Sequence, residues 1–310
     1  MGGTIRQFGV GVWVAGGAAH NRLYQLTVSD NTDFGVIVAE STDSVIEKTA
    51  MSDTGISGLI LADSRRALVA RNSVLGSHGY AVVLFAVEDS RIQNNKLNGN
   101  DHGIAVFDGS SRNTVRRNAV SHSGGSAIDI GGEGVAANRV EHNRLRDNGD
   151  GIILTEASDN VIRHNLVTGT GFFGFPDTGG FGVILDGADR NMLDRNIVTG
   201  GRGPAIFVAQ LDAPTAAEDN VVCRNFVNSK LTDGILIDKG ATGTLLIRNI
   251  AIRNGDDGID VDAPATTLTR NIANRNHDLG IEAVAGVIDG GGNHAAGNGN
   301  PVQCTNIDCN

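Results

Sequence analysis

A short hydrophobic alternation recurs along the whole chain at intervals of 22 to 31 residues. The first and the third residue after each starting position are aliphatic in every repeat, from Val12 and Val14 to Ile281 and Ala283. Aliphatic residues at a period of two are typical of a β-strand that buries one face. The starting positions are all small residues: Gly11, Gly35, Gly58, Ala81, Gly103, Ala127, Gly151, Gly182, Ala205, Gly234, Gly258 and Gly280.

A second pattern, Asn-x-Val-x-x-Asn, lies in the middle of the repeats, for example at Asn113, Val115 and Asn118. Asparagine tolerates left-handed turns, and its amide can hydrogen-bond to an identical amide in a neighbouring coil. Coils of about 24 residues that stack identical residue types predict an all-β fold, a right-handed parallel β-helix of about 12 coils. We expect residues 1–300 to form this solenoid and residues 301–310 a C-terminal tail.

Two other folds fit the repeat less well. A leucine-rich repeat needs a Leu-x-x-Leu-x-Leu consensus and a convex helix, and the chain has neither. An antiparallel up-and-down barrel does not require aliphatic residues and asparagines to stay in register over twelve repeats. Composition agrees with repeated strands and turns, because the chain has 43 glycines and only 4% aromatic residues.

Charge and cysteine content narrow the setting of the protein. A net charge of −10 argues against a general nucleic-acid binder, and no apolar run approaches the length of a membrane-spanning helix. The N-terminus shows no signal peptide and begins inside the repeat, so we expect a removed export signal. Cys304 and Cys309 could staple the tail, whereas Cys223 falls on a strand. This pattern suits an extracellular or periplasmic location.

The outward positions of the first strand in each coil form an apolar zone in the N-terminal half. A soluble monomer rarely leaves such a patch exposed, so either a loop or missing segment covers it or a second copy of the protein binds there. Its residues are Ile37, Ile60, Val83, Phe85, Ala105 and Phe107.

The same outward positions are acidic in the C-terminal half. Asp238 and Asp262 share one predicted column, and Asp260 and Glu282 share the other, with vertical neighbours about 5 Å apart. Carboxylates this close need a raised pKa, a cation or a basic neighbour such as Lys239. Oxygen ligands alone would favour Ca²⁺, so the cofactor prediction is either none or Ca²⁺ at these four acids. A solvated acidic face is the alternative.

The turns before two of these strands carry further aspartates, in Thr-Asp-Gly at residues 232–234 and Asp-Asp-Gly at residues 256–258. These turns resemble the Thr-Asp-Gly and Asp-Asp motifs of polygalacturonases. The resemblance implies that Asp233, Asp256 and Asp257 protonate the leaving oxygen and activate water. Leu279 stands where that family has a histidine, His277 lies two residues earlier, and the family's Arg-x-Lys segment has no counterpart.

The chain as a whole resembles the secreted proteins that carry parallel β-helix repeats, the pectate-lyase-like superfamily. That superfamily includes polysaccharide lyases, polygalacturonase-like hydrolases and mannuronan C5-epimerases. The resemblance covers nearly the whole chain and is specific for the fold, so function has to be argued from the site.

Two long insertions, at residues 170–180 and 210–217, enter and leave the first strands of neighbouring coils. Long loops on a rigid solenoid often carry function, and aromatic rings suit stacking on sugar faces. A self-packed surface loop is the alternative. The residues that we expect to contact substrate are Phe172, Phe173, Phe175, Asp186, Arg202 and Phe207.

A basic column precedes the asparagines of the ladder. It could bind a polyanionic glycan, or it could neutralise acids and carbonyls on a solvated flank. Its residues are Arg71, Arg117, His142, His164, Arg195, Arg224, Arg248 and Arg270.

These patterns lead to a carbohydrate-active protein that binds a polysaccharide or oligosaccharide on the first sheet. Hydrolysis by paired carboxylates is the first hypothesis, and a polysaccharide lyase or a uronate C5-epimerase with Ca²⁺ is the enzymatic alternative. A non-catalytic solenoid that binds glycans or self-associates through the apolar zone is the third. The candidate catalytic residues are Asp233, Asp238, Lys239, Asp256, Asp257, Asp260, Asp262 and His277.

Overall fold

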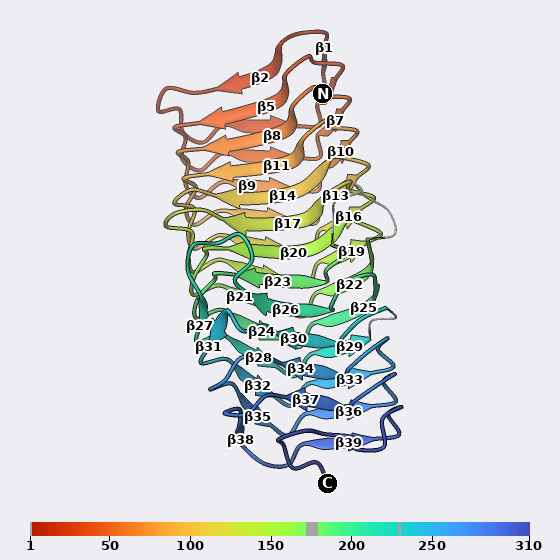
Figure 1. Ribbon diagram of the computed structural model, residues 1–310. Helices are drawn as coiled ribbons and strands as arrows, with labels where there is room; N and C mark the ends of the chain where they lie inside the picture. The colour runs from red at the N-terminus through yellow and green to blue at the C-terminus, as the bar shows by residue number, and fades with distance from the viewer. Residues whose placement is uncertain (1, 172–178, 229–230) are drawn as a thin grey trace.

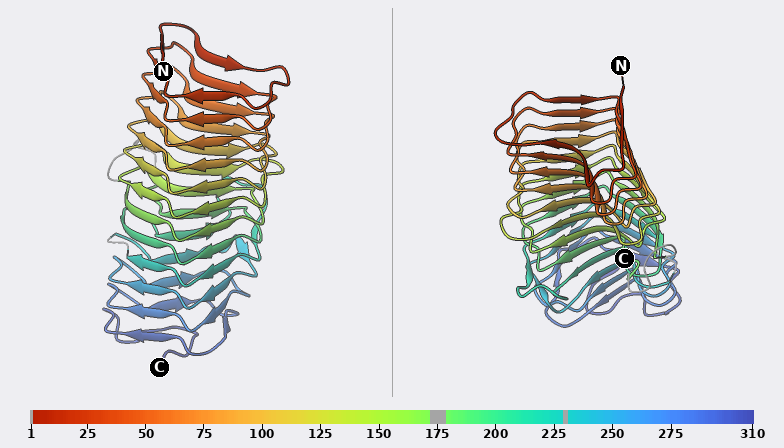
Figure 2. Two further views of the ribbon diagram at one scale, coloured as in Figure 1. Left: turned by 180° about the vertical axis from the view of Figure 1, so that it is seen from behind. Right: turned by 90° about the horizontal axis from the view of Figure 1, so that it is seen from above.

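The computed structural model describes residues 2–171, 179–228 and 231–310. The secondary-structure elements within these residues are all β-strands. Each coil of the chain contributes three short strands, and the coils stack into a rod with the termini at opposite ends (Figure 1). Consecutive strands of one sheet come from successive coils and pair in parallel. Figure 2 shows the same stack from behind and from above. The predicted parallel β-helix is confirmed.

The first sheet has 12 strands. They are β2 (Val10–Val14), β5 (Phe34–Ala39), β8 (Ser57–Ala62), β11 (Tyr80–Phe85), β14 (His102–Phe107), β17 (Ser126–Gly131), β20 (Asp150–Thr155), β23 (Val183–Asp186), β26 (Ile206–Ala209), β30 (Ile235–Ile237), β34 (Ile259–Val261) and β37 (Ile281–Ala283).

The second sheet also has 12 strands. They are β3 (Arg22–Tyr24), β6 (Val45–Glu47), β9 (Leu68–Ala70), β12 (Arg91–Gln93), β15 (Thr114–Arg116), β18 (Arg139–Glu141), β21 (Val161–Arg163), β24 (Met192–Asp194), β28 (Val221–Cys223), β32 (Leu245–Ile247), β35 (Thr267–Thr269) and β38 (Ile288–Asp289).

The third sheet has 13 strands, and a small fourth sheet pairs β27 (Ala217–Glu218) with β31 (Ala241–Thr242). The strands of the third sheet are β1 (Thr4–Arg6), β4 (Thr27–Ser29), β7 (Ala50–Ser52), β10 (Ser73–Leu75), β13 (Lys96–Asn98), β16 (Ala119–Ser121), β19 (Arg144–Arg146), β22 (Leu166–Thr170), β25 (Ile197–Gly201), β29 (Phe226–Asn228), β33 (Ile250–Ile252), β36 (Ile272–Asn274) and β39 (His294–Ala296).

The aliphatic residues of the repeat fill the interior of the rod. Val82 of β11 pairs with Leu59 of β8 on one side and with Ile104 of β14 on the other. All three side chains are at most 1% exposed, so identical positions of successive coils form one continuous apolar column. This is the register that the spacing of the repeat predicts.

The small residue that starts each first-sheet strand has a steric reason. A Cβ atom on Gly151 would lie 2.1 Å from the carbonyl oxygen of Gly182 in the next coil and 2.6 Å from Val167 Cγ1. The backbone of the next coil and a core side chain therefore leave little room at this position. Ala81, Ala127 and Ala205 show that other coils accept one methyl group there.

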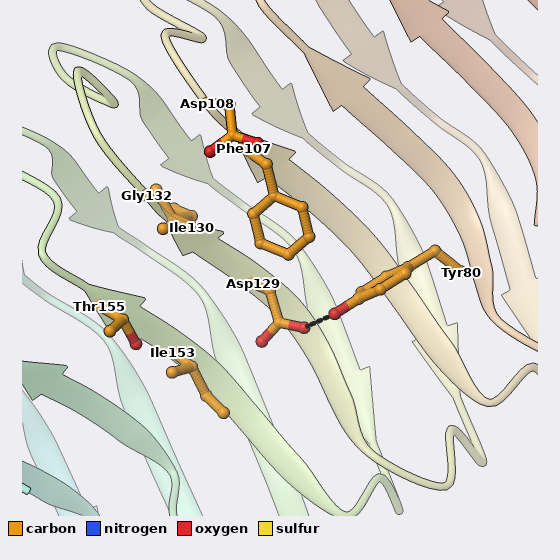
Figure 3. A pocket seen from close by; sticks show the side chains of 9 residues that line it. Tyr80, Phe107, Asp108, Asp129, Ile130, Gly132, Ile153 and Thr155 are labelled. Carbon is orange, nitrogen blue, oxygen red and sulfur yellow. Dashed lines mark hydrogen bonds between the residues drawn. The ribbon is translucent and has the colours of Figure 1, made fainter. Parts of the chain in front are cut away.

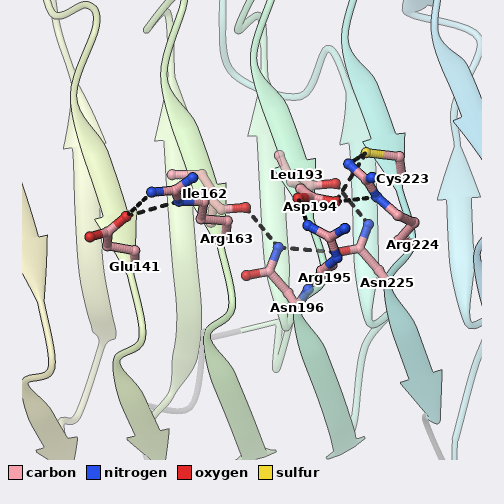
Figure 4. Close-up of polar contacts among 10 residues, drawn as sticks. All are labelled: Glu141, Ile162, Arg163, Leu193, Asp194, Arg195, Asn196, Cys223, Arg224 and Asn225. Carbon is pink, nitrogen blue, oxygen red and sulfur yellow. Dashed lines mark hydrogen bonds and ion pairs between the residues drawn. The ribbon is translucent and has the colours of Figure 1, made fainter.

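The predicted asparagine ladders are present and run along the rod. The Asn118 backbone N–H and side-chain amide both donate to Asn143 Oδ1, at 2.9 and 3.1 Å. The Asn143 groups donate to Asn165 Oδ1 in the same way, and the pattern continues through Asn196 and Asn225 (Figure 4). Because each buried amide bonds the coil on either side, the ladder satisfies polar groups that the core would otherwise leave unpaired.

The residue before each ladder asparagine adopts the left-handed conformation, with a φ of 53° at Arg117, 58° at His142 and 54° at His164. This conformation costs a non-glycine residue about 1–2 kcal/mol. The hydrogen bonds of the following asparagine offset that cost, and the turn leaves the preceding side chain exposed to solvent.

The C-terminal segment crosses the last coil. Cys304 forms a parallel bridge with Ile281, and Cys309 forms one with Asn293. Cys304 and Cys309, the pair expected to staple the tail, form a disulfide, and the nearby Ile307 is 9% exposed and packs on the core. The tail therefore covers the apolar end of the solenoid.

Candidate functional site

Three of the predicted carboxylates come together at the C-terminal half of the first sheet. Asp233 and Asp257 end the turns that enter β30 and β34, and Asp260 projects from β34 itself. One carboxylate oxygen of each lies within 4.8 Å of the other two. The Asp257 backbone N–H also donates to Asp233 Oδ1 at 3.0 Å, and Asp257 Oδ1 accepts the Leu279 N–H at 2.6 Å.

Burial and mutual repulsion change the acidity of this carboxylate cluster. Burial, a hydrogen bond with Glu282 and the charge of that residue raise the pKa of Asp257 to about 8. Burial and the charges of Asp262 and Asp233 raise the pKa of Asp260 to about 7, and burial also raises that of Asp233. At least one proton is therefore held among these acids at neutral pH.

The spacing of the cluster bears on its chemistry. Two carboxyl groups of an inverting glycosidase stand about 6.5–9.5 Å apart, and those of a retaining enzyme about 5–5.5 Å apart. In this cluster, one oxygen of each carboxyl lies within 4.8 Å of one oxygen of each of the others. Carboxyl oxygens this close can share a proton or bind a cation.

The remaining predicted catalytic residues surround the cluster. Glu282 pairs with Asp260 in register, as the column analysis requires. Asp256 belongs to a second acidic group, with Asp257 and Asp278, and His277 is an exposed turn residue whose backbone N–H bonds the Asp256 carbonyl. Three further candidates lie at the far ends of β30 and β34: Asp238, Lys239 and Asp262.

Two predicted substrate contacts are buried. Asp186 is 5% exposed, and its carboxylate accepts the backbone N–H groups of Leu211 and Ala213, at 2.7 and 3.3 Å. Phe207 is 7% exposed and stacks on Phe181, with ring centroids 5.4 Å apart. In this structure the Asp186 carboxylate holds the backbone of the second insertion and Phe207 packs against Phe181, so their role in substrate binding stays a prediction.

The other predicted contacts are less informative. Arg202 is exposed beside the backbone of Gly180. Phe172, Phe173 and Phe175 lie outside the described residues.

A second set of polar side chains lies on the first sheet toward the N-terminus, on β11, β14 and β17. The Tyr80 hydroxyl donates to Asp129 Oδ2 at 2.7 Å (Figure 3). His102 stacks on Tyr80 with centroids 4.6 Å apart, and its Nδ1 lies 3.8 Å from Asp129 Oδ2 and 3.3 Å from Ser126 Oγ. We call Tyr80, His102 and Asp129 the tyrosine–histidine–aspartate cluster.

Tyr80 and Asp129 of this cluster line a groove of about 460 Å³, and His102 lies behind the lining in contact with Tyr80. Phe107, Gly131 and Thr155 stand in register on successive coils, so Gly131 leaves a gap between two larger residues. Asp129 stands between Ala105 and Ile153 in the neighbouring column. The groove is lined by Tyr80, Phe107, Asp108, Asp129, Ile130, Gly131, Gly132, Ile153 and Thr155.

The environment of the groove raises the pKa of both Asp129 and Tyr80. Burial raises the pKa of Asp129, although hydrogen bonds from Ser126 and Tyr80 oppose the shift. Burial and the Asp129 charge raise the pKa of Tyr80 well above its usual range, so the phenol stays protonated at neutral pH. A Cβ atom on Gly125 would lie 2.2 Å from His102 Cε1, so the His102 ring occupies space that a glycine leaves free.

The same region corrects the predicted apolar zone. Val83 is 2% exposed and Ala105 is fully buried, whereas Phe85 is 38% exposed. The rings of Tyr80, Phe85 and Phe107 pack against one another at 5.6 and 5.9 Å. The zone is therefore interrupted, and its aromatic part lies beside the groove. Ile37, Ile60 and Phe107 are half-buried.

Sequence reasoning missed the tyrosine–histidine–aspartate cluster, although a signal was present. Asp129 is the one charged residue among the first eight members of an outward column that is otherwise apolar. Tyr80 and His102 stand immediately before the small residue of adjacent coils, at a position where β11 and β14 pair. A third outward column, read at that position, would have placed both beside Asp129.

The family comparisons match most of the chain. A family model described as "Periplasmic copper-binding protein (NosD)" matches residues 79–255, and one described as "Right handed beta helix region" matches residues 4–120. A comparison with curated proteins finds no match. The coils are those of a right-handed parallel β-helix.

Solved structures with the same fold share little sequence with this chain. A double mutant of the periplasmic alginate epimerase AlgG is 15% identical with a TM-score of 0.63, over 95% of this chain and 76% of that chain. The A-module of mannuronan C-5 epimerase AlgE4 from Azotobacter vinelandii is 15% identical with a TM-score of 0.56, over 80% and 91%. The catalytic unit of a GH87 α-1,3-glucanase from Streptomyces thermodiastaticus is 16% identical with a TM-score of 0.54, over 93% and 63%.

Within the described residues, the chain has no helix of the length and apolar character needed to cross a membrane.

Proposed function

The chain belongs to the NosD family, whose model matches more than half of it. We propose that this protein binds and modifies a polysaccharide in the groove of the first sheet. The observation that carries the proposal is the 2.7 Å hydrogen bond between Tyr80 and Asp129 in the groove wall, with His102 beside both. Titratable side chains that contact one another in a groove on a rigid sheet are typical of an acid–base site.

The proposed chemistry is proton transfer at a sugar carbon. His102 is the candidate general base, because its ring stacks on Tyr80, which lines the groove, and its Nδ1 lies 3.8 Å from Asp129 Oδ2. Tyr80 is the candidate acid, because it lines the groove and its phenol O–H already donates a hydrogen bond to Asp129. Asp129 holds both side chains in place and is a positioning residue. In both reactions of a uronate the base removes the proton from C5. In an epimerisation the acid then returns a proton to the opposite face of C5, whereas in a β-elimination the bond from C4 to the glycosidic oxygen breaks and the acid protonates that oxygen.

The charge of the groove limits the substrate. The charged residues that line it, within the described part of the chain, are Asp108 and Asp129. The raised pKa of Asp129 lowers the negative charge that these two carboxyls would otherwise carry. A polyuronate is therefore tolerated better at a pH at which Asp129 is protonated than at a pH at which it is ionised, and a neutral glycan is tolerated at either.

The comparisons support a polysaccharide as the substrate class and an extracytoplasmic location. Two of the similar structures are named as epimerases of alginate or mannuronan, one of them periplasmic, and a third as an α-1,3-glucanase. The family description is also periplasmic. We place this protein in the periplasm or outside the cell on that support.

The copper named in the family description does not fit the residues that the structure describes. Groups of three or more potential ligands consist there of aspartates only, Asp233, Asp257 and Asp260 in one group and Asp256, Asp257 and Asp278 in the other. Copper sites in proteins are built from imidazole, thiolate or thioether ligands, whereas carboxylates suit Ca²⁺ or Mg²⁺. We derive no step through copper.

The test is activity of the purified protein on a panel of acidic and neutral polysaccharides. Proton NMR would detect epimerised sugars, ultraviolet absorbance would detect the unsaturated ends of an elimination, and a reducing-end assay would detect hydrolysis. We expect His102→Gln and Tyr80→Phe each to lower kcat about 10²–10⁴-fold.

Phe85→Leu is the matched control, because Phe85 lies on the same strand as Tyr80 but does not line the groove. It should keep at least half of the activity. Full activity of His102→Gln would contradict the assignment of the base. Binding of a polysaccharide with no turnover by the parent protein would leave the non-catalytic alternative.

Hydrolysis at the carboxylate cluster is the second candidate. The observation that favours it is the pKa of about 8 at Asp257, which keeps a general acid protonated at neutral pH. Asp257→Asn would then abolish the release of reducing ends while His102→Gln would not. The cluster lies five coils from Asp129 in the same outward column, about 24 Å away, so the two sites can be tested independently.

A further inference from the structure

A second groove lies on another side of the rod, at the turn between the second and third sheets. It has a volume of about 560 Å³ and includes four basic side chains: Arg117, His142, Arg144 and His164. The other described residues that line it are neutral: Asn118, Ala119, Asn143 and Leu166. The protein as a whole carries a net charge of −10, so this concentration of positive charge is local.

The turn conformation builds the groove. Arg117, His142 and His164 each precede a ladder asparagine and have a φ of 53–58°. The ladder holds these three positions above one another, and the His142 and His164 rings stack in parallel with centroids 4.9 Å apart. Arg144 starts β19 of the third sheet and forms the opposite side. Arg117, His142 and His164 therefore project from backbone positions that the ladder fixes.

The acids near these side chains are already paired with other cations (Figure 4). Glu141 Oε2 bonds Arg163 at 2.7 Å, and Asp194 bonds Arg195 at 3.2 Å and Arg224 at 2.7 Å. In the described parts of the chain, no carboxylate lies within 4.0 Å of a guanidinium nitrogen of Arg117 or Arg144. The positive charge of the groove is thus left for a ligand.

The titration of His164 agrees with this positive field. Burial lowers its pKa first, and the neighbouring charges of His142, Arg195 and Arg163 lower it further, against the opposite effect of Asp194. The described groups of three potential metal ligands contain no histidine, which directs the interpretation toward an anion.

We propose that this groove binds a segment of a linear anionic glycan, carboxylated or sulfated, whose charges lie on Arg117 and Arg144 of adjacent coils and whose oxygens accept hydrogen bonds from the rings of His142 and His164. The positions of Arg117, His142 and His164 in successive coils repeat about every 4.8 Å, close to the length of one sugar unit. A single-stranded nucleic acid would need aromatic platforms for its bases, and this groove offers only the two histidine rings. The proposal does not rest on turnover at the first sheet, because the two grooves share no residue.

The test is calorimetric titration of the full-length protein with trigalacturonate and with a sulfated trisaccharide, at 20 mM and 200 mM salt. The variant is Arg117→Asn with Arg144→Gln, since asparagine accepts the left-handed conformation of residue 117. We expect binding to the parent protein to weaken with salt, and the double variant to bind at least 10-fold more weakly. Circular dichroism should show an unchanged fold.

Arg270→Asn is the matched control, because Arg270 has the same conformation, with a φ of 56°, but lies outside the groove. It should change the Kd less than 2-fold. The proposal is overturned if neither trisaccharide binds at 20 mM salt, or if Arg270→Asn weakens binding as much as the double variant. It is also overturned if a single-stranded DNA of equal charge binds more tightly, or if inorganic sulfate alone binds as tightly as the trisaccharides.

Discussion

At the residue scale, the buried aspartates of the first sheet have different neighbours. Asp186 and Asp150 are buried, and their carboxylates accept backbone N–H groups from inserted loops, at Leu211 and Phe181. Asp257 is as deeply buried but lies beside other acids. Burial raises the pKa of Asp150 although the N–H groups of Phe181 and Gly180 oppose the shift, whereas burial and the neighbouring Glu282 together raise the pKa of Asp257 to about 8.

Stability should therefore depend on pH through Asp257. Its pKa is about 8 in the folded protein and ordinarily 3.8, so its contribution to stability is complete below about pH 4 and is lost as the pH rises through 8. We expect Asp257→Asn to gain about 1–3 kcal/mol relative to the parent protein between pH 5 and pH 9, measured by urea unfolding.

Glu133→Gln is the control, because Glu133 is an exposed acid far from the cluster. It should change the pH profile little. A stability difference between Asp257→Asn and the parent that stays constant from pH 5 to pH 9 would show that Asp257 is ionised throughout.

At the scale of the strand and turn, the ladders hold the coils in register. Asn143 Oδ1 accepts two bonds from Asn118, and the Asn143 side-chain N–H groups donate to the Val115 carbonyl and Asn165 Oδ1, both at 3.0 Å. Removal of this amide leaves buried donors and an acceptor of two other coils without partners.

We expect Asn143→Ala to cost about 2–4 kcal/mol of unfolding free energy, because several buried polar groups lose their partners together. Chemical denaturation followed by circular dichroism would measure it. Arg139→Ala, at an exposed position of the same coil, should stay within about 0.5 kcal/mol of the parent. Equal effects of the two substitutions would show that the ladder contributes little.

The repeat explains why so much of the fold could be predicted from the sequence. Identical positions recur, so the pairing of Val82 with Ile104 and of Asp260 with Glu282 follows from spacing alone. Contacts between different columns do not follow from spacing. The bond from Tyr80 to Asp129 joins side chains two coils apart, and the packing of Phe181 on Phe207 depends on an insertion whose path no periodicity fixes.

At the scale of the whole molecule, a solenoid has two ends where strands lack a partner. The C-terminal segment covers one of these ends through the bridges of Cys304 and Cys309 and the packing of Ile307. An uncovered sheet edge exposes unpaired backbone N–H and C=O groups that can pair with another molecule. Removal of the covering segment would therefore favour association.

Deletion of residues 301–310 should therefore promote association that grows with protein concentration, as measured by light scattering. The double variant Cys304→Ser and Cys309→Ser keeps the covering segment without its disulfide, and we expect it to retain the mass of the parent protein. An unchanged mass after the deletion would show that the last coil protects its own edge.

All three sheets rise by the same distance with each coil, so distances along the rod increase in equal steps. Each coil adds the same increment along the axis, so a duplicated coil between Asp129 and Asp260 would lengthen their separation by one fixed step without changing either neighbourhood. The shortest oligosaccharide that can reach both positions would then be longer by the length of that step.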